Sequence, residues 1–185
     1  MTPFRVVDST ARGRAGFLDL VELTVEGPDG ESFTRSVVRH PGAAVVVPVE
    51  GGEAILVRQW RAAAGRALLE VPAGKRDVAG EEPEATAARE LEEEIGRRPG
   101  RLTKLAEFYN SPGFTDEYTH LYCATELSET ERRGVSAEER AMSIERVRLA
   151  DVPALVAARQ VVDAKSIIGL LLTRQLLGDG GAGRA

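Results

Sequence analysis

Cysteine is almost absent from this sequence, since Cys123 is the only one among 185 residues. One thiol excludes a disulfide within the chain, and the apolar neighbours of Cys123 predict that it is buried and inert. Basic residues are also in the minority, because 24 Lys and Arg stand against 29 Asp and Glu and give a formal net charge of −5. Such a chain has no general attraction for nucleic acid, so neither DNA nor RNA is expected as a partner.

Long apolar runs are missing as well. The longest, residues 167–172, is far too short to cross a bilayer, and the first residues lack the charged-then-apolar pattern of a signal peptide. We therefore expect a cytoplasmic protein with no membrane partner. The 43% hydrophobic and 29% charged residues are typical of a globular protein, and this length suits one hydrophobic core.

Short strand-like runs dominate the first third of the chain. Residues 18–25 and 32–38 flank the turn formers of 27–30, which predicts an N-terminal hairpin. Residues 43–49 and 54–58 are rich in Ala, Val and Ile, which indicates strands that are covered on both faces. Further strands are predicted at 68–71, 102–109, 119–124 and 143–149.

Helices are predicted in the middle and at the end of the chain. Pro83 suits a first helical turn and Gly96 suits a left-handed cap, so a helix is expected over residues 83–95. Residues 153–160 and 163–177 have helical patterns. We expect a charged, mobile loop at 126–140 and a disordered tail at 178–185.

The helix at 83–95 carries the most informative residues. Glu90, Glu93 and Glu94 are spaced i, i+3 and i+4 and share one side, while Glu92 points away from them. Like charges at this spacing destabilise a helix by about 0.2–0.5 kcal/mol per pair unless a positive group lies against them. A divalent cation such as Mg²⁺ or Mn²⁺ suits these oxygens, and Arg89 can neutralise and orient part of the cluster.

A run of glutamates by itself usually marks a solvated helix face, but the surroundings of this run favour a site. A strand, the tripeptide Pro72-Ala73-Gly74 and a loop ending at Glu81 precede the helix. This order resembles the Nudix box. The matching residues are Glu81, Arg89, Glu90, Leu91, Glu93, Glu94 and Gly96. The sequence departs from the pattern by one extra residue between Gly74 and Glu81 and by Arg97 at an apolar position.

The resemblance implies an α/β fold, in which a mixed sheet lies between helices in an α/β/α sandwich, with the N-terminal β-hairpin added. It implies Glu90, Glu93 and Glu94 as metal ligands, together with the backbone carbonyl of Ala73. Mg²⁺ is the expected cofactor, with Mn²⁺ as a possible substitute, and the reaction is attack of water at phosphorus. Arg89 and Glu93 are the catalytic candidates on the helix.

A second segment, residues 110–117, is similar to the Ser-Pro-Gly segment of ADP-ribose pyrophosphatases, with Pro112 sixteen residues after Gly96. The candidate substrate-binding residues there are Ser111, Pro112, Gly113 and Glu117. Residues 40–43 and 57–61 also resemble that group. Arg58 and Arg61 have forked donors that suit phosphate or ribose, although surface arginines are common. Trp60 could stack on adenine, but a tryptophan is more often a core or interface residue.

The resemblance also bears on the catalytic base and on assembly. Related enzymes use a glutamate from the acidic loop to complete the metal site or to act as base, which points to Glu139 first and Glu138 second, although an ordinary charged loop is nearly as plausible. The expected division is residues 1–40 as a strand segment that forms a homodimer, 41–177 as the Nudix hydrolase domain, and 178–185 as the tail.

The leading functional expectation is hydrolysis of the diphosphate bond of ADP-ribose, a small nucleotide substrate, to AMP and ribose 5-phosphate. Two alternatives stay open. The same metal ligands could serve another nucleotide sugar such as GDP-mannose, or a nucleoside triphosphate, because they do not choose the base or the sugar. The chain could also be a sensor that binds ADP-ribose without hydrolysis, which the complete set of glutamates disfavours.

Overall fold

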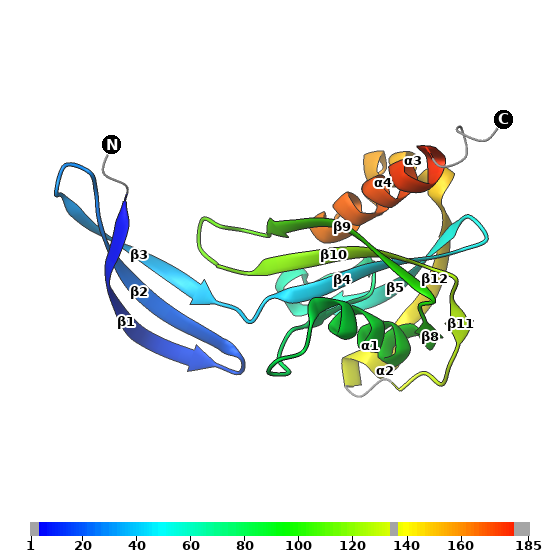
Figure 1. Cartoon of the computed structure of the whole chain (residues 1–185), viewed down its shortest axis with the longest axis horizontal. Coiled ribbons are helices and arrows are strands. Elements are labelled where there is room, and N and C mark those ends of the chain that lie inside the picture. Colours follow the sequence, from blue (N-terminus) through cyan, green and yellow to red (C-terminus); the bar gives the residue numbers. More distant parts are fainter. Residues whose placement is uncertain (1–3, 134–136, 180–185) are drawn as a thin grey trace. The chain divides into compact units, whose positions relative to one another are not determined.

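The computed structural model describes residues 4–133 and 137–179 (Figure 1). The chain divides into two compact units. The smaller unit comprises Met1–Gly42 and Phe108–Thr119, and the larger unit comprises Ala43–Glu107 and His120–Ala185. Strands β9 (Arg101–Tyr109) and β10 (Tyr118–Thr125) begin in one unit and end in the other.

The smaller unit is an antiparallel sheet of three strands in the order β1-β2-β3. The expected hairpin is present as β2 (Leu18–Glu26) and β3 (Ser32–Arg39), and the Gly30 N–H donates to the Gly27 carbonyl within its turn. The strand β1 (Arg5–Ala15), which pairs with β2, was not predicted. All of its residues are exposed, so the strand lacks the alternation of buried and exposed positions by which sequence patterns identify strands.

The larger unit contains the main sheet, whose order is β12-β5-β4-β10-β9, with β6 paired to β5 and β7 paired to β4. The β4 strand is buried along nearly its whole length, as expected for a strand covered on both faces. The remaining strands are β4 (Ala43–Glu50), β5 (Glu53–Arg61), β6 (Arg66–Glu70), β7 (Ala73–Lys75), β12 (Ser143–Arg148), and the short pair β8 (Arg97–Arg98) and β11 (Ser128–Glu129). Two 3₁₀ turns, Ala62–Ala64 and Leu149–Asp151, join strands to their neighbours.

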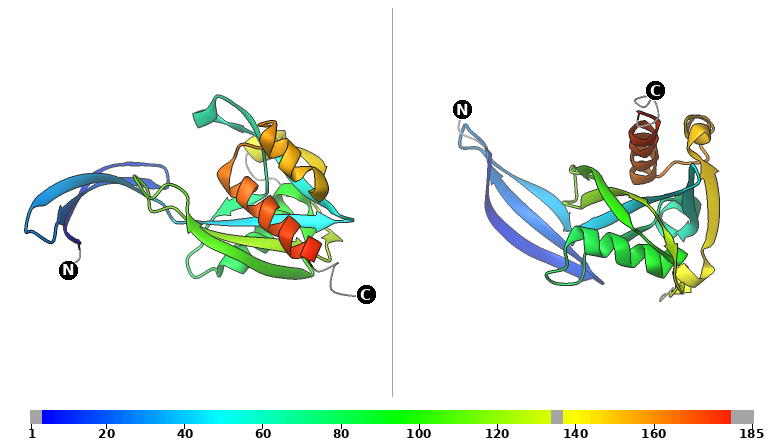
Figure 2. Two further views of the ribbon diagram at one scale, coloured as in Figure 1. Left: turned by 90° about the horizontal axis from the view of Figure 1, so that it is seen from above. Right: turned by 45° about the vertical axis from the view of Figure 1, so that its right-hand side comes forward.

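Helices cover both faces of this sheet (Figures 1 and 2). On one face, α1 (Pro83–Ile95) packs Leu91 and Ile95 into the core cluster that contains Val46 of β4. On the other face lie α3 (Val152–Ala157) and α4 (Ala164–Asp179). A Cβ atom at Gly169 of α4 would stand only 2.8 Å from Val47 Cγ2, so a glycine permits this close approach. The α/β/α arrangement predicted from the sequence is confirmed.

Two of the predicted helices have different ends in the structure. The first closing helix stops at Ala157 rather than near 160, because Arg159 has a left-handed backbone with φ of 57°. The second continues to Asp179, while residues 180–185 of the expected tail lie outside the described part. The charged segment at 126–140 contains β11 and the short helix α2 (Ala137–Ala141).

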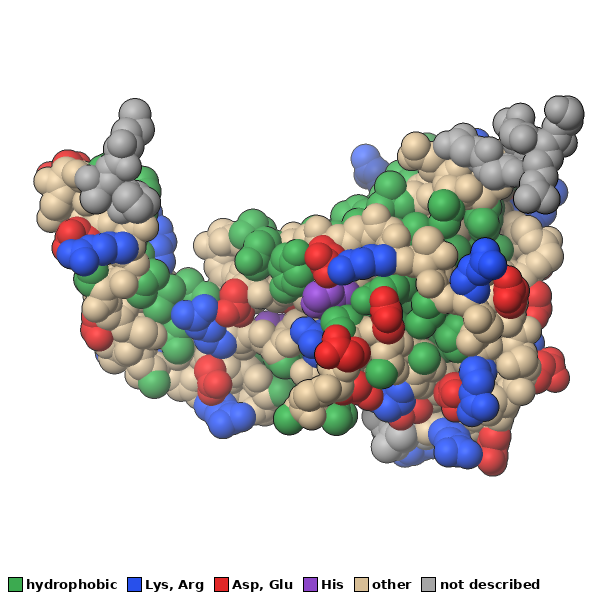
Figure 3. Space-filling view, viewed as in Figure 1, with side chains coloured by type: hydrophobic (Ala, Val, Ile, Leu, Met, Phe, Trp, Pro, Cys, Tyr) green, Lys and Arg blue, Asp and Glu red, His purple; other side chains and the backbone are tan. Residues whose placement is uncertain are grey.

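The surface of the larger unit mixes charges of both signs. On the face seen in Figure 3, acidic and basic side chains are interspersed. Several charged side chains of this unit form ion pairs, such as Lys104 with Glu107 at 2.5 Å. Within residues 4–133 and 137–179, no helix is both long and apolar enough to span a bilayer.

Candidate active site

The helix α1 begins and ends where its sequence predicts. Pro83 stands at its N-terminus, and Gly96 caps its C-terminus with φ of 63° while its N–H donates to the Glu92 carbonyl. Burial of Leu91 and Ile95 against the sheet fixes the rotation of the helix about its axis. This rotation leaves Glu90 and Glu94 only 8% and 4% exposed. Two carboxylates are therefore held at the inner edge of the helix rather than in solvent.

Arg89 gathers three carboxylates around one guanidinium group. Its Nη1 donates to Glu90 Oε1 at 2.8 Å and to Glu93 Oε2 at 3.1 Å, while Nε and Nη2 each lie 3.3 Å from an oxygen of Glu81. Thr86 Oγ1 donates a further bond to Glu81 at 2.7 Å. The predicted partnership of Arg89 and Glu93 is present, and Glu81 from the preceding loop joins it.

These contacts shift the pKa values of two of the groups. Burial alone would lower the pKa of Arg89, but its bond to Glu81 and the charges of Glu90 and Glu93 raise it, so the guanidinium stays charged. Bonds from Arg89 and Thr86 hold the pKa of Glu81 below its usual value. By contrast, Glu92 bonds to Arg98 at 2.7 Å. The expectation that Glu92 points away from the cluster is confirmed.

The turn before α1 presses against the buried carboxylates. The Ala73 N–H donates to Glu94 Oε2 at 3.3 Å, and the Val46 N–H donates to the Pro72 carbonyl at 3.0 Å. A Cβ atom at Gly74 would lie 1.9 Å from Glu90 Cδ, which is far inside contact distance. Glycine is therefore required at position 74 for Glu90 to occupy its place.

The donor set fits a divalent cation. Four carboxylates, Glu81, Glu90, Glu93 and Glu94, and the Arg89 guanidinium carry a formal charge of −4 + 1 = −3. Buried charge of one sign is unfavourable without a counter-charge, and oxygen ligands suit Mg²⁺ and Mn²⁺. In the described ranges, no group of three Asp, Glu, His or Cys side chains is arranged as a metal site. Arg89 and the Ala73 N–H engage oxygens of Glu90, Glu93 and Glu94.

Arg61 lies beside this cluster and bonds to a buried acid. Its Nε and Nη2 donate to the two oxygens of Glu70, each at 2.8 Å. The bond to Glu70, together with the charges of Asp163 and Glu94, raises the pKa of Arg61. The sequence analysis passed over Glu70, although a charged residue inside the apolar run of residues 68–71 is a signal that could have found it.

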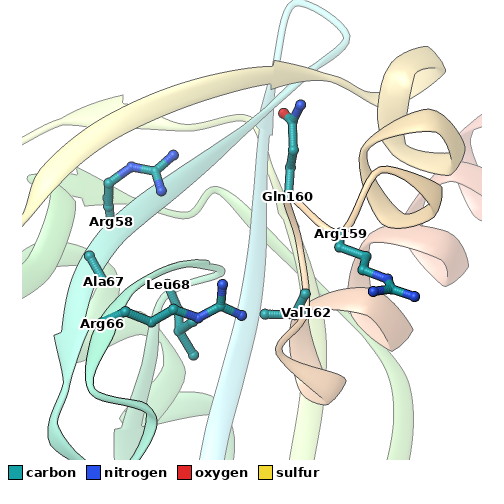
Figure 4. A pocket seen from close by; sticks show the side chains of 7 residues that line it. All are labelled: Arg58, Arg66, Ala67, Leu68, Arg159, Gln160 and Val162. Atoms are coloured by element: carbon teal, nitrogen blue, oxygen red, sulfur yellow. The ribbon is translucent and has the colours of Figure 1, made fainter.

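Arg58 and Trp60 are exposed, whereas the alternate residues Val57 and Gln59 of β5 are buried, because side chains alternate between the two faces of a strand. Arg58 is paired with Glu145 at 2.5 and 3.0 Å and borders a hollow of about 270 Å³. The guanidinium of Arg66 also faces that hollow, whereas that of Arg159 points away from it (Figure 4).

Trp60 is 57% exposed, so it is not the core residue that tryptophan usually is. It borders a second hollow of about 400 Å³ together with Arg58 and Glu138. The structure thus brings one base candidate, Glu138, near Trp60. The other, Glu139, belongs to α2 by its backbone, but its side chain lies outside the described residues.

The Ser-Pro-Gly segment belongs to the smaller unit, where it is attached to the end of β3. The Val38 N–H donates to the Phe114 carbonyl at 2.8 Å, and Arg39 pairs with Asp116 at 2.7 Å. Within the segment, the Phe114 N–H donates to the Ser111 carbonyl and the Asn110 N–H to the Glu117 carbonyl. Pro112 and Gly113 lie in the turn that these bonds close.

Comparisons with known proteins show the family of the chain. The family model of the NUDIX domain matches residues 38–168. An ADP-ribose pyrophosphatase of Bacillus subtilis (strain 168) is 45% identical over 150 residues, which cover 80% of each chain. An ADP-ribose pyrophosphatase of Mycobacterium tuberculosis is 36% identical over 169 residues, covering 91% of this chain and 82% of the relative.

The fold has a close counterpart among solved structures. The crystal structure of an ADP compounds hydrolase has a TM-score of 0.87 at 22% identity, and the likeness covers 100% of this chain and 98% of the other. At this identity the likeness speaks for the fold alone. Together with the family match and the glutamate helix, it leads to one conclusion: the chain belongs to the Nudix family and is a Nudix hydrolase.

Proposed function

We propose that this Nudix hydrolase is an ADP-ribose pyrophosphatase, which splits ADP-ribose into AMP and ribose 5-phosphate. The observation that carries the proposal is the set of carboxylates that Arg89 and the Pro72–Gly74 turn hold along one side of α1. The choice of ADP-ribose is supported by the relatives named ADP-ribose pyrophosphatase, which are 45% and 36% identical over most of the chain.

Nudix hydrolases need a divalent metal. We assign this role to Mg²⁺, with Mn²⁺ as a substitute, and the ligands to Glu90, Glu93, Glu94 and the carbonyl of Ala73. When bound, the cation neutralises the diphosphate and lowers the pKa of the attacking water. Arg89 then keeps Glu90 and Glu93 oriented.

In the reaction, a water oxygen forms a bond to one phosphorus atom while the bridging P–O bond breaks. The leaving phosphate takes the bridging oxygen, and the proton from water passes to a carboxylate. Glu139, with Glu138 as second candidate, is proposed as that base, since a general base must come within hydrogen-bond reach of the water.

Substrate contacts are proposed for Arg58, Arg61 and Trp60. Arg61 uses two of its five N–H donors on Glu70 and is 38% exposed, so donors remain for a phosphate or ribose oxygen. The exposed ring of Trp60 is available to stack on adenine. The Ser-Pro-Gly segment is proposed to contribute Ser111, Pro112, Gly113 and Glu117.

A cytoplasmic homodimer is proposed as the working form, assembled through residues 1–40, with 41–177 as the hydrolase domain. Large apolar side chains on the smaller unit support this assembly, because an exposed apolar surface gains free energy when a partner covers it. They are Phe4, Val6, Val7, Phe17 and Leu20, each at least 43% exposed.

Turnover of a substrate panel tests the proposed function. With Mg²⁺ present, we expect the highest kcat/KM on ADP-ribose, lower values on GDP-mannose and dGTP, and equal amounts of AMP and ribose 5-phosphate. A higher kcat/KM on GDP-mannose or dGTP would contradict the choice of substrate. Tight binding of ADP-ribose without product would instead support the sensor alternative.

A further inference from the structure

The first turn of α4 takes part in a polar network of which the proposed mechanism uses only Arg61. Glu70, which is 1% exposed, receives hydrogen bonds from Arg61 and from Lys165 Nζ, the latter at 2.6 Å. Lys165 Nζ also donates to Asp163 Oδ1 at 2.7 Å. The two carboxylates, of Glu70 and Asp163, thus balance the charge of the two cations, Arg61 and Lys165.

Ser166 extends this network to the backbone ahead of the active site. It is fully buried, and its hydroxyl donates to Asp163 Oδ2 at 2.6 Å while accepting the Val71 N–H at 2.9 Å. The Ser166 N–H also donates to Asp163 Oδ2, at 2.9 Å, so Asp163 caps the helix. The hydroxyl is therefore held in one orientation by a fixed acceptor.

The segment that Ser166 holds leads directly to the glutamate cluster. Val71 is followed by Pro72, whose carbonyl accepts the Val46 N–H, and by Ala73, whose N–H donates to Glu94. The helices α4 and α1 lie on opposite faces of the sheet (Figure 2). Ser166 of α4 bonds to Val71, just before the tripeptide, and Glu94 of α1 bonds to Ala73 within it.

We propose that Ser166 and Lys165 are positioning residues for the hydrolase reaction. Ser166 sets the place of Ala73 opposite Glu94, and Lys165 holds Glu70 and, through it, Arg61. The inference rests on the proposed function, because it assigns Ala73 to the metal and Arg61 to the substrate. The printed bonds lead from Ser166 through Val71 to Ala73, which donates to Glu94, and from Lys165 through Glu70 to Arg61.

A contribution to stability alone does not explain why these residues form a buried network. A buried ion pair is weak evidence for stability, because desolvation offsets most of its attraction. Partners that orient the residues of a metal site, on the other hand, commonly change metal affinity or activity about 10–100-fold when removed. The Ser166 branch leads to Ala73 at the metal site, and the Lys165 branch leads to Arg61 at the substrate. Removing Ser166 should therefore affect kcat and metal affinity, and removing Lys165 should affect KM.

The Ser166 branch is tested with Ser166→Ala. We expect kcat to fall about tenfold or more and Mn²⁺ alone to bind about tenfold more weakly, as measured by electron paramagnetic resonance of free Mn²⁺, with an unchanged KM. Should this variant fail to fold, Ser166→Cys keeps the side-chain volume and replaces the hydroxyl by a weak acceptor, and the same result is expected.

The Lys165 branch is tested with Lys165→Met, which removes the charge but keeps most of the chain length. We expect KM for ADP-ribose to rise about tenfold with Mn²⁺ binding unchanged, and Lys165→Arg to restore KM because it retains the cation. Arg174→Met is the matched control, since it removes a charge from an exposed position of the same helix.

The two tests separate the inference from the proposed function. If wild-type protein leaves ADP-ribose intact, the proposed function fails, while the Mn²⁺ measurement on Ser166→Ala still decides the inference. The inference is overturned if both variants keep wild-type constants, or if they lose kcat only in proportion to a lowered melting temperature, with neither Mn²⁺ affinity nor KM changed.

Discussion

Substituting Gly74 should remove activity while leaving the fold nearly intact. An added Cβ would lie 1.9 Å from Glu90 Cδ, 2.0 Å from Oε1 and 2.4 Å from Cγ. Carbon atoms in contact stand about 3.5 Å apart, so the Glu90 carboxylate must move by about 1.6 Å in Gly74→Ala. All three crowded atoms belong to a flexible side chain, which can turn away without disturbing the backbone.

The displacement acts on the site rather than on the core. Glu90 would lose its 2.8 Å bond to Arg89, a charge-assisted contact worth about 1.5–3 kcal/mol, which corresponds to roughly 10–150-fold in rate if the bond is needed in the transition state. A misplacement of about 1 Å can itself cost about 100-fold. We therefore expect kcat/KM to fall by about 100-fold in Gly74→Ala.

The assay is steady-state hydrolysis of ADP-ribose together with a thermal melt. Gly178→Ala is the matched control, because a Cβ there meets nothing within 4 Å and alanine suits a helix. Wild-type kcat/KM and Mn²⁺ affinity in Gly74→Ala would refute the argument that Glu90 must occupy this place. A melting temperature far below that of wild type would show instead that position 74 serves the fold.

Further predictions concern charge and burial. Glu93→Gln and Glu94→Gln should each lower kcat much more than the melting temperature, whereas Glu92→Gln, which alters a residue outside the cluster, should be nearly silent; equal activity of all three in saturating Mg²⁺ would contradict the site. Burial alone would raise the pKa of Glu70, but the bonds to Arg61 and Lys165 lower it below its ordinary value of 4.5. The ionised Glu70 therefore stabilises the fold above pH 4.5, and this stabilisation is lost as the pH falls below that value. Unfolding by urea across pH 3–7 should therefore show a smaller loss of stability on the acid side in Glu70→Gln. Burial raises the pKa of Cys123, so iodoacetamide should label the native protein much more slowly than the unfolded one, as mass spectrometry would show.

Local features of the sequence were sufficient to predict the central helix. Pro83 and Gly96 mark its ends by backbone preferences that need no tertiary contact, and the spacing of Glu90, Glu93 and Glu94 places them on one side through helical geometry alone. The match to the Nudix box rests on the same short-range order. For these reasons the fold class and the kind of chemistry were predictable from the sequence.

Sequence patterns did not predict the strands that form only because they pair with a strand elsewhere in the chain. The strand β1 has only exposed residues, so its pairing with β2 left no periodic signal. The extra strand β7 follows Pro72, where a loop was expected, because β4 offers it backbone partners. These elements exist through pairing rather than through burial of their own side chains.

The sequence by itself determined that a glutamate-bearing helix follows a strand and a glycine-containing turn, because caps and periodicity act over a few residues. Only the tertiary structure decided what surrounds that helix. Arg58 meets Glu145, 87 residues away, and Val71 meets Ser166, 95 residues away. The first contact joins the neighbouring strands β5 and β12, and the second joins the sheet to α4. No local preference of any of these residues encodes its partner.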